Sequence, residues 1–206
     1  MWVSIAVAIL AGYLLGNLNG AVVMSHILHD DVRNHGSGNA GLTNFIRSYG
    51  AGKALLVVVI DAGKALLACL IGALLLNVYG KWTEGAAFGG LAVMIGHAFP
   101  VLLHFRGGKG ILSGLFVAFF VDWRIAVLIL AVFAVAYFTT QYVSLGSVLA
   151  AAAFAVGFVI FHYDNLTVML CGVAMGLLAI FLHWQNIARL LKCQERKTNL
   201  FKKDKA

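Results

Sequence analysis

The sequence predicts an all-α integral membrane bundle of about seven transmembrane helices, one of them short. Two observations predict this fold class. First, 62% of the 206 residues are hydrophobic, only 11% are charged, and the mean hydropathy is +0.93. Ordinary soluble domains are about 45–50% apolar and about 25% charged. Second, the apolar residues are gathered into runs long enough to cross a bilayer.

A membrane crossing needs about 20 consecutive, mostly apolar residues. Six runs of roughly this length lie near residues 2–25, 54–79, 86–103, 125–140, 143–161 and 166–183. Residues 109–121 form a seventh and shorter apolar run. Such a run can cross only where neighbouring helices shield it or where the bilayer is thinned. We therefore expect a short helix packed among the others.

The distribution of Lys and Arg predicts the orientation, because positively charged loops stay in the cytoplasm. With seven crossings, one side carries twelve Lys and Arg residues and the other carries only Lys81 and Arg124. We therefore expect the N-terminus outside and the C-terminus in the cytoplasm. Residues 1–206 are expected to form a single membrane domain with a basic cytoplasmic tail from about residue 189. This tail either anchors the topology or also attracts anionic lipid headgroups.

The segment GSGNAGLTN, residues 36–44, contains three glycines at the G-x-G-x-x-G spacing of a nucleotide-binding turn. Its context excludes a dinucleotide-binding fold, because an apolar span precedes it and no alternation of strands and helices follows. The glycines instead permit backbone N–H groups to point at an anion. Side-chain donors for the same anion are Ser37, Asn39, Thr43, Asn44 and Arg47. The alternative is a flexible loop at the membrane surface.

A second glycine-rich basic segment, FRGGKG at residues 105–110, contains Gly107, Gly108, Lys109 and Gly110. Glycines allow close approach to the backbone, and a helix starting after Lys109 points the positive end of its dipole at this segment. We expect a second anion site here, with an ordinary turn between helices as the alternative. His97 precedes the segment and is either a packed, hydrogen-bonded residue or part of this site.

Other polar residues lie in or beside the apolar runs. Asp61 and Lys64 are spaced i, i+3, so they can form a structural ion pair or one wall of a polar site. Ser144 and Ser147 are candidates for substrate contacts, although serines in membrane helices more often bond a neighbouring carbonyl.

Near the end of the chain, His183 and Asn186 share one helical face. An imidazole and an amide at this spacing could hold and deprotonate an alcohol. The three cysteines share no spacing typical of a metal site, and we expect no metal and no cofactor.

Four segments occur in a recognisable order: GSGNAGLTN with Arg47, GHAFPVLLHFRGGKG, YVSLGS and HWQNIARLL. Together they resemble the bacterial PlsY family, integral membrane glycerol-3-phosphate acyltransferases that use acyl phosphate as donor. The resemblance covers nearly the whole chain. It implies a seven-helix bundle in the bacterial inner membrane whose active site faces the cytoplasm. It also implies glycerol 3-phosphate as acceptor, a donor that arrives through the membrane lipids, and lysophosphatidic acid and phosphate as products. We expect a monomer with no nucleic-acid partner.

By position, the resemblance assigns substrate and catalytic roles in all four segments. We expect catalytic roles for Ser37, Lys109, His183 and Asn186. Substrate-binding roles fall on Asn39, Thr43, Asn44, Arg47, Ser144 and Ser147. From the residues themselves we add His97, Gly107, Gly108 and Gly110. The general base is either His183 or a phosphate oxygen of a substrate. The chain has Trp184 and Gln185 where the family typically has Arg and Glu.

Two competing interpretations use other features of the chain. His26 and Asp31 form H-x-x-x-x-D, the signature of a different class of glycerolipid acyltransferases. We interpret it as coincidental, because the downstream motifs of that class are missing. The basic loops and the Asp61–Lys64 pair would also suit a membrane transporter of phosphate or organophosphate anions. Against transport, the polar residues gather at one face rather than at the midplane.

Overall fold

The structure, a computed structural model, describes residues 1–198, and this range contains helices and no strand. The end of the predicted basic tail, with Lys202, Lys203 and Lys205, lies outside the described residues. The α-helices are α1 (Trp2–Gly16), α2 (Gly20–Ile27), α3 (Leu42–Tyr49), α4 (Ala54–Asn77), α5 (Trp82–Ala98), α6 (Ile111–Val121), α7 (Trp123–Thr140), α8 (Val143–Phe161), α9 (Leu166–Leu182) and α10 (Trp184–Leu191). Short 3₁₀ turns, η1 (Val32–Asn34), η2 (Ala51–Lys53) and η3 (Val101–Leu103), lie in the connections.

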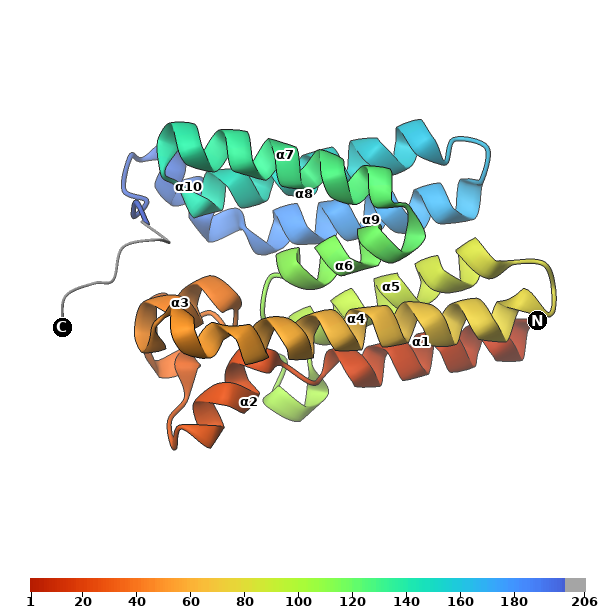
Figure 1. Ribbon diagram of the computed structural model, residues 1–206, viewed down its shortest axis with the longest axis horizontal. Helices are drawn as coiled ribbons and strands as arrows, with labels where there is room; N and C mark the ends of the chain where they lie inside the picture. Colours follow the sequence, from red (N-terminus) through yellow and green to blue (C-terminus); the bar gives the residue numbers. More distant parts are fainter. Residues whose placement is uncertain (199–206) are drawn as a thin grey trace.

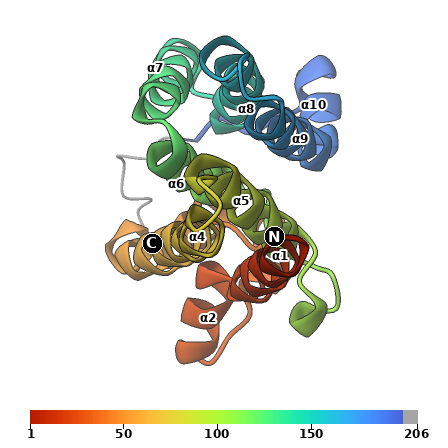
Figure 2. The same cartoon turned by 90° about the vertical axis from the view of Figure 1, so that its right-hand side faces the viewer.

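The helices form two groups on either side of the short helix α6. Helices α1, α4 and α5 pack together in one group, and α7, α8 and α9 form the other (Figures 1 and 2). Helix α6 contacts α4, α5, α7 and α8, and α5 also packs against α9. The short apolar run is therefore a helix shielded by its neighbours, as expected.

Five helical segments are long and apolar enough to cross a membrane: Trp2–Ile27, Ala51–Asn77, Trp82–Leu103, Trp123–Thr140 and Val143–Phe161. Helices α9 and α10 would give a sixth span if counted as one, but a bend of 55° separates them. Helix α6 is shorter, with 11 residues. The all-α membrane bundle is thus confirmed. The count of seven crossings and the orientation stay predictions.

The first span is broken, whereas the sequence predicted one continuous helix over residues 2–25. Helix α1 ends at Gly16 and α2 begins at Gly20. The Asn19 side chain caps α2 by accepting from the backbone N–H of Val22. Helix α4 pairs the backbone groups freed by the break: Lys64 Nζ donates to Leu18 O at 2.6 Å, and Gly20 N donates to Asp61 Oδ1 at 3.1 Å. A break at membrane depth is stable only with such internal partners.

Glycines bring the backbones of the first helix group into direct contact. A Cβ on Gly72 in α4 would lie 2.0 Å from the carbonyl oxygen of Gly85 in α5, and a Cβ on Gly96 would lie 2.2 Å from that of Tyr13 in α1. Small residues at such crossings are typical of membrane helices, which associate by close packing rather than by excluding water. The close contact positions the ends of α4 and α5, and therefore the loop that follows α5.

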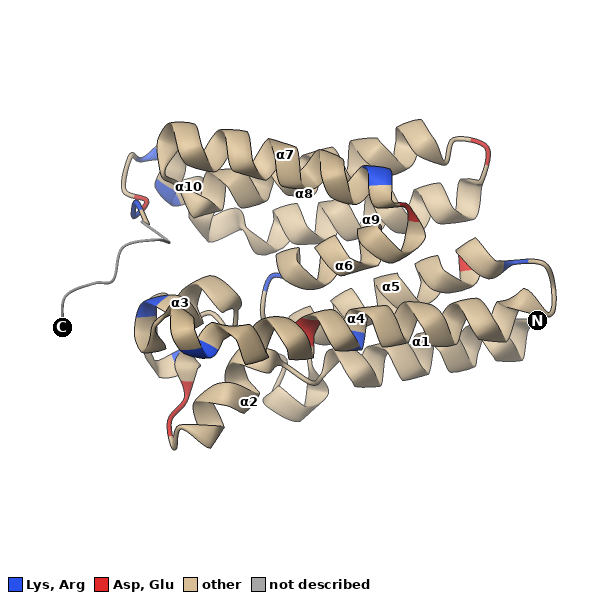
Figure 3. Ribbon diagram, viewed as in Figure 1, with Lys and Arg blue, Asp and Glu red and all other residues tan. Residues whose placement is uncertain are grey.

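Charged residues are concentrated at one end of the bundle. Figure 3 shows most of the Lys and Arg at the end that carries α3 and α10, opposite the N-terminus. The four segments that contain the predicted site residues, 33–47, 104–110, 139–147 and 183–195, lie toward this end (Figure 1).

Candidate active site

Asn44 shapes the first glycine-rich loop from inside. Its Nδ2 donates to the carbonyl oxygens of Val32 and His35 at 3.0 Å and of Asn39 at 3.1 Å, and its Oδ1 accepts from the backbone N–H of Ser37 at 2.9 Å. The side chain is 2% exposed. Both amide protons are therefore used within the loop. Asn44 therefore holds the loop in shape, and the prediction that it donates to a ligand is corrected, because its amide protons are used by the loop carbonyls.

The glycine spacing of this loop allows the backbone to fold around Asn44. Gly36 and Gly38 have φ angles of +58° and +71°, in the left-handed region that favours glycine. A Cβ on Gly36 would lie 2.3 Å from Asn44 Oδ1. The G-x-G pattern is therefore needed for the chain to wrap around Asn44, which leaves Ser37 exposed on the surface of the loop.

The two glycine-rich loops meet at Gly108. A Cβ on Gly108 would lie 2.3 Å from His97 Nε2 and 2.6 Å from the carbonyl oxygen of Ala40 in the first loop. A Cβ on Gly107 would lie 2.0 Å from His97 O, and the backbone N–H of Gly108 donates to that oxygen at 3.1 Å. Glycine is therefore required at both positions, so that the second loop can pack between His97 and the first loop.

Cationic side chains from distant elements surround one carboxylate. Lys109 Nζ donates to Asn186 Oδ1. Asn186 Nδ2 donates in turn to Glu195 Oε1 at 3.0 Å, and Arg189 Nε donates to Glu195 Oε2 at 2.6 Å. Arg47 lies close enough to Arg189 and Glu195 for their charges to influence its pKa. Through Asn186 and Arg189, helix α10 thus links Lys109 in the second loop to Glu195, which follows the helix.

The electrostatics of this cluster favour an anion. Burial lowers the pKa of Lys109 to about 8, repulsion from Arg189 and Arg47 acts in the same direction, and Glu195 opposes the shift. Burial also lowers the pKa of Arg47 below its usual range. Among residues 1–198, the cluster sets Arg47, Lys109 and Arg189, with Arg196 also near Arg47, against the carboxylate of Glu195, so it has a surplus of positive charge. A phosphate group would neutralise that surplus.

The last described residues fold back onto the cluster. The Thr198 hydroxyl accepts from Arg47 Nη2, its N–H donates to Gln141 O at 3.0 Å, and its carbonyl oxygen accepts from Tyr137 Oη at 3.0 Å. Neither Thr198 nor Glu195 was predicted from the sequence as a member of the site. A signal for Glu195 was available, because it is the one acidic residue in the basic stretch 183–198. Thr198 carried no such signal.

His183 lies at the junction of α9 and α10, with its side chain 4% exposed. Its Nδ1 is 2.7 Å from the carbonyl oxygen of Ala179. A carbonyl only accepts, so Nδ1 carries the proton and Nε2 keeps a lone pair. Lys109 lies close to this ring. The geometry therefore leaves His183 Nε2 available to accept a proton beside the cations.

Helix α8 contributes the two predicted serines, both buried near its start. Ser144 lies close to Glu195. Within residues 1–198, no hydrogen bond joins Ser37, Asn39 or Thr43 to the second loop. The structure therefore brings Arg47, Lys109 and Asn186 together with Glu195, while those three residues of the first loop stay at its surface or edge.

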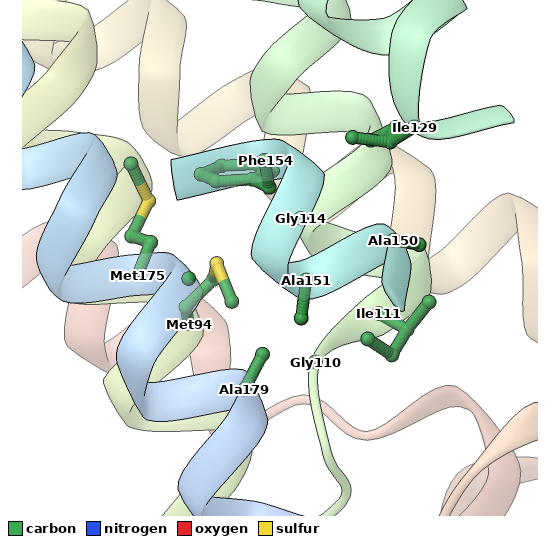
Figure 4. Close-up of a pocket in the computed structure, with 11 residues that line it drawn as sticks. Met94, Gly110, Ile111, Gly114, Ile129, Ala150, Ala151, Phe154, Met175 and Ala179 are labelled. Carbon is green, nitrogen blue, oxygen red and sulfur yellow. The ribbon is translucent and has the colours of Figure 1, made fainter. Parts of the chain in front are cut away.

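An apolar cavity of about 20 Å³ lies directly behind the second loop (Figure 4). Met94, Phe154 and Met175 line it, together with Gly110 and Ala179 at the edge of the polar cluster. It has room for about one water molecule, but the apolar side chains around it offer a water few partners. The second loop is thus backed by apolar side chains on the side of this cavity.

Comparison with known proteins identifies this arrangement. A family model described as glycerol-3-phosphate acyltransferase matches residues 6–193. The chain belongs to the glycerol-3-phosphate acyltransferase family. A relative from Finegoldia magna named as such an enzyme is 40% identical over 138 residues, which are 66% of this chain and 67% of the relative. One from Symbiobacterium thermophilum is 42% identical over 147 residues, 71% of this chain and 70% of the relative.

Two solved structures of PlsY, an integral membrane glycerol 3-phosphate acyltransferase, have the same fold as this acyltransferase. The glycerol 3-phosphate form matches with a TM-score of 0.86 and 31% identity, over 97% of this chain and 100% of the other. The lysophosphatidic acid form matches with a TM-score of 0.82 and 31% identity, over 96% of each chain. The family resemblance predicted from the sequence is confirmed, and it favours acyl transfer over the transport alternative.

The competing H-x-x-x-x-D pattern is a loop contact in this acyltransferase. His26 Nε2 lies 3.9 Å from Asp31 Oδ2, and the His26 side chain is 58% exposed. Asp31 is held instead by Arg33, whose Nη2 lies 2.7 Å from the same oxygen. This carboxylate therefore closes a turn, which agrees with the interpretation of the pattern as coincidental.

Proposed function

We propose that this chain transfers an acyl group from acyl phosphate to the sn-1 hydroxyl of glycerol 3-phosphate, releasing lysophosphatidic acid and phosphate. The observation that carries the proposal is the cluster of Arg47, Lys109 and Arg189 around Glu195, next to the junction of the two glycine-rich loops. Both substrates carry a phosphate, so the reaction needs two neighbouring anion sites at a membrane surface. The transport alternative needs no such pair of sites.

Arg47 and the first loop hold the glycerol 3-phosphate, with Ser37, Asn39 and Thr43 as further contacts. Arg47 is suited to this role because its guanidinium can bind phosphate through two hydrogen bonds. In the structure, this side chain donates to the Thr198 hydroxyl. That neutral partner is weaker than a phosphate, so the substrate can displace it.

Lys109 and the N–H group of Gly110 hold the acyl phosphate and the oxyanion that develops on its carbonyl. The acceptor oxygen forms a bond to the carbonyl carbon, and the bond from that carbon to the phosphate oxygen breaks with its electron pair. Phosphate is a good leaving group, so no covalent enzyme intermediate is required. The loss of one oxyanion donor typically costs about 3–4 kcal/mol of transition-state stabilisation.

His183 and Asn186 orient the attacking hydroxyl, and His183 Nε2 or a substrate phosphate takes its proton. We expect His183→Ala to lower kcat by about 10²–10⁴ if the histidine is the base, as is usual for general bases. Initial rates of lysophosphatidic acid formation measure this. A loss of less than about tenfold would assign the proton to a phosphate oxygen, whose pKa of about 6 suits that role.

The acyl chain of the donor lies in an apolar groove on the outer face of α7 and α8. This groove has a volume of about 460 Å³ and runs from Ala131 and Leu149 to Thr139 and Thr140. Its polar end lies beside Gln141, whose carbonyl oxygen bonds Thr198. A chain in this groove would therefore end close to the cation cluster while its methylene groups stay in lipid.

We also propose that the enzyme acts as a monomer in the bacterial inner membrane, with its site facing the cytoplasm. The basic residues lie mainly at the site's end of the bundle (Figure 3). Glycerol 3-phosphate then reaches the site from the cytoplasm and the donor from the lipid.

The test is purified protein in detergent with glycerol 3-phosphate and one donor at a time: acyl phosphate, acyl-CoA or acyl carrier protein. We expect lysophosphatidic acid and stoichiometric phosphate with acyl phosphate alone. Product from acyl-CoA instead would overturn the donor assignment. Uptake of glycerol 3-phosphate into proteoliposomes without any acylated product would overturn the reaction itself.

A further inference from the structure

The connection between α5 and the second glycine-rich loop exposes apolar side chains at its tip. Leu102 and Phe105 are 74% and 61% exposed, and Val101 is also exposed. Figures 1 and 2 show this connection, in light green, projecting from the bundle beside α1. Apolar residues scattered singly over a surface are ordinary, but several at one turn indicate that something covers them.

The backbone of this connection is paired within the protein. Each N–H group from Leu102 to Arg106 has a partner: Leu102 N donates to Asn17 Oδ1 at 3.1 Å, Leu103 N and Phe105 N to Pro100 O at 3.1 and 2.9 Å, His104 N to Val101 O at 3.2 Å, and Arg106 N to Leu103 O at 3.1 Å. A loop in water does not need this pairing, because water satisfies exposed N–H groups, whereas a loop against lipid does. The pairing therefore suits apolar surroundings.

Two residues adopt a left-handed backbone conformation in this turn. His104 and Phe105 have φ angles of +55° and +60°, which are unfavourable for a residue with a Cβ. The reversal of the chain brings the N–H of Phe105 back to Pro100 O. Glycine would adopt the same turn without strain. It would, however, remove the exposed phenyl ring from the tip.

The connection lies at membrane depth. Leu102 bonds Asn17, and the next residue, Leu18, accepts from Lys64 Nζ at 2.6 Å. From Lys64, α4 continues to Asn77, a distance of about 20 Å at about 1.5 Å per residue. The hydrocarbon core of a bilayer is about 30 Å thick. With Asn77 at the far boundary, the connection lies in the half of the bilayer nearer the cation cluster.

The apolar tip is continuous with the lipid-facing surface of the first span and has basic residues beside it. Leu14 and Leu18, on either side of Asn17, are both exposed. His104 and Arg106 are exposed as well. Among residues 1–198, the Arg106 side chain has no hydrogen-bond or ion-pair partner. An apolar tip beside an unpaired cation suits the boundary where acyl chains meet anionic headgroups.

We propose that residues 101–106 form an interfacial loop that inserts Leu102 and Phe105 among the acyl chains of the bilayer and holds the Arg106 guanidinium against the headgroups of anionic lipids. The loop leads directly into Gly107, Gly108 and Lys109. Its lipid contacts therefore anchor one side of the site at the membrane surface, whichever acyl donor the enzyme uses.

Nitroxide spin labels test the insertion directly. Leu102→Cys and Phe105→Cys are made separately in a Cys193→Ser background, in which the remaining cysteines are buried. The full-length protein in proteoliposomes is exposed to oxygen, which concentrates in lipid, and to a water-soluble nickel chelate. We expect both labels to meet oxygen freely and nickel rarely. The label on Leu74→Cys, an exposed position on α4, should behave in the same way.

Two other outcomes would overturn the insertion. A label on the native Cys193, which is exposed after α10, supplies the aqueous reference. Nickel contact at the loop as high as at Cys193 would place the loop in water. Low contact with both reagents would mean that protein covers the tip. Leu102 lies outside the left-handed turn, so its label reads the environment even where a change at Phe105 disturbs the turn.

The headgroup contact is tested by lipid composition. The Phe105→Cys label is compared in vesicles of neutral phosphatidylcholine and in vesicles that also contain anionic phosphatidylglycerol. We expect Arg106→Gln to raise nickel contact at this label in the anionic vesicles only, because an anionic surface attracts each basic residue near it. The matched control Lys53→Gln removes another exposed cation and should have no effect. No response to Arg106→Gln, or an equal response to Lys53→Gln, would overturn the contact between Arg106 and the headgroups.

Discussion

Lys109 has a pKa within the working range of an assay. Burial lowers it to about 8, so the ammonium is charged below that pH and neutral above it. The same side chain is proposed to hold the acyl phosphate. The electrostatic contribution of Lys109 to substrate binding is therefore present at neutral pH and lost as the pH rises through the pKa of the free enzyme.

We predict that kcat/KM for acyl phosphate falls as the pH rises from about 7 to about 9, with an apparent pKa near that of Lys109. Initial rates corrected for spontaneous donor hydrolysis measure this. In Lys109→Arg, the alkaline fall should disappear, because a guanidinium stays charged throughout this range. A wild-type profile that is flat across this range would exclude the charge of Lys109 from substrate binding.

At the residue scale, the sequence predicted most of the site's members but not all of their roles. Lys109 and Asn186 were predicted and do meet. Asn44 was predicted as a donor to the ligand, yet its protons bond the loop carbonyls. The residue type shows that a side chain can donate hydrogen bonds, but only the folded loop determines which acceptors it meets.

At the scale of elements, hydropathy located the spans but not the break within the first one. The residues around the break are too few to change the average hydropathy of a long apolar run. The break is stabilised by the Asp61–Lys64 ion pair on α4. Asp61 lies 41 positions after Gly20 along the chain, and Lys64 lies 46 positions after Leu18. The sequence of the first span alone therefore gives no indication of this partner.

We predict that Gly96→Ala lowers the stability of the bundle by about 1–3 kcal/mol, the usual cost of overpacking. The added methyl group would lie 2.2 Å from the carbonyl oxygen of Tyr13 and would force α1 and α5 apart. Unfolding in detergent, followed by circular dichroism, measures this. The matched control is Gly63→Ala, which meets no neighbour and should stabilise α4 slightly. Equal stability of the two variants would contradict the close packing of α1 and α5.

The groove on α7 and α8 makes a prediction about chain length. Leu149→Trp fills its apolar end, so KM should rise severalfold for long-chain acyl phosphates and stay unchanged for short ones. Leu170→Trp places the same ring on an exposed position of α9, outside the groove, and serves as the control. Equal effects of Leu149→Trp on long and short donors would place the acyl chain elsewhere.

At the scale of the whole molecule, the orientation in the membrane can be read with a natural cysteine. Cys193 is exposed after α10, near the cation cluster, whereas Cys69 and Cys171 are buried. We predict that a membrane-impermeant maleimide labels Cys193 in inverted inner-membrane vesicles and not in intact spheroplasts. Lys81→Cys, in the α4–α5 connection at the other end of the bundle, should show the opposite pattern. Labelling of Cys193 from outside the cell would reverse the predicted topology.

The sequence by itself determined the membrane class, the approximate spans, the two glycine-rich loops and the family. These properties depend on local composition and on short motifs, which can be read along the chain. The tertiary structure decided the rest: the broken first span, the entry of Glu195 and Thr198 into the site, and the contact of the buried Asp61–Lys64 pair with His97. Each of these depends on hydrogen bonds between residues far apart in the chain, and such partners are chosen by helix packing.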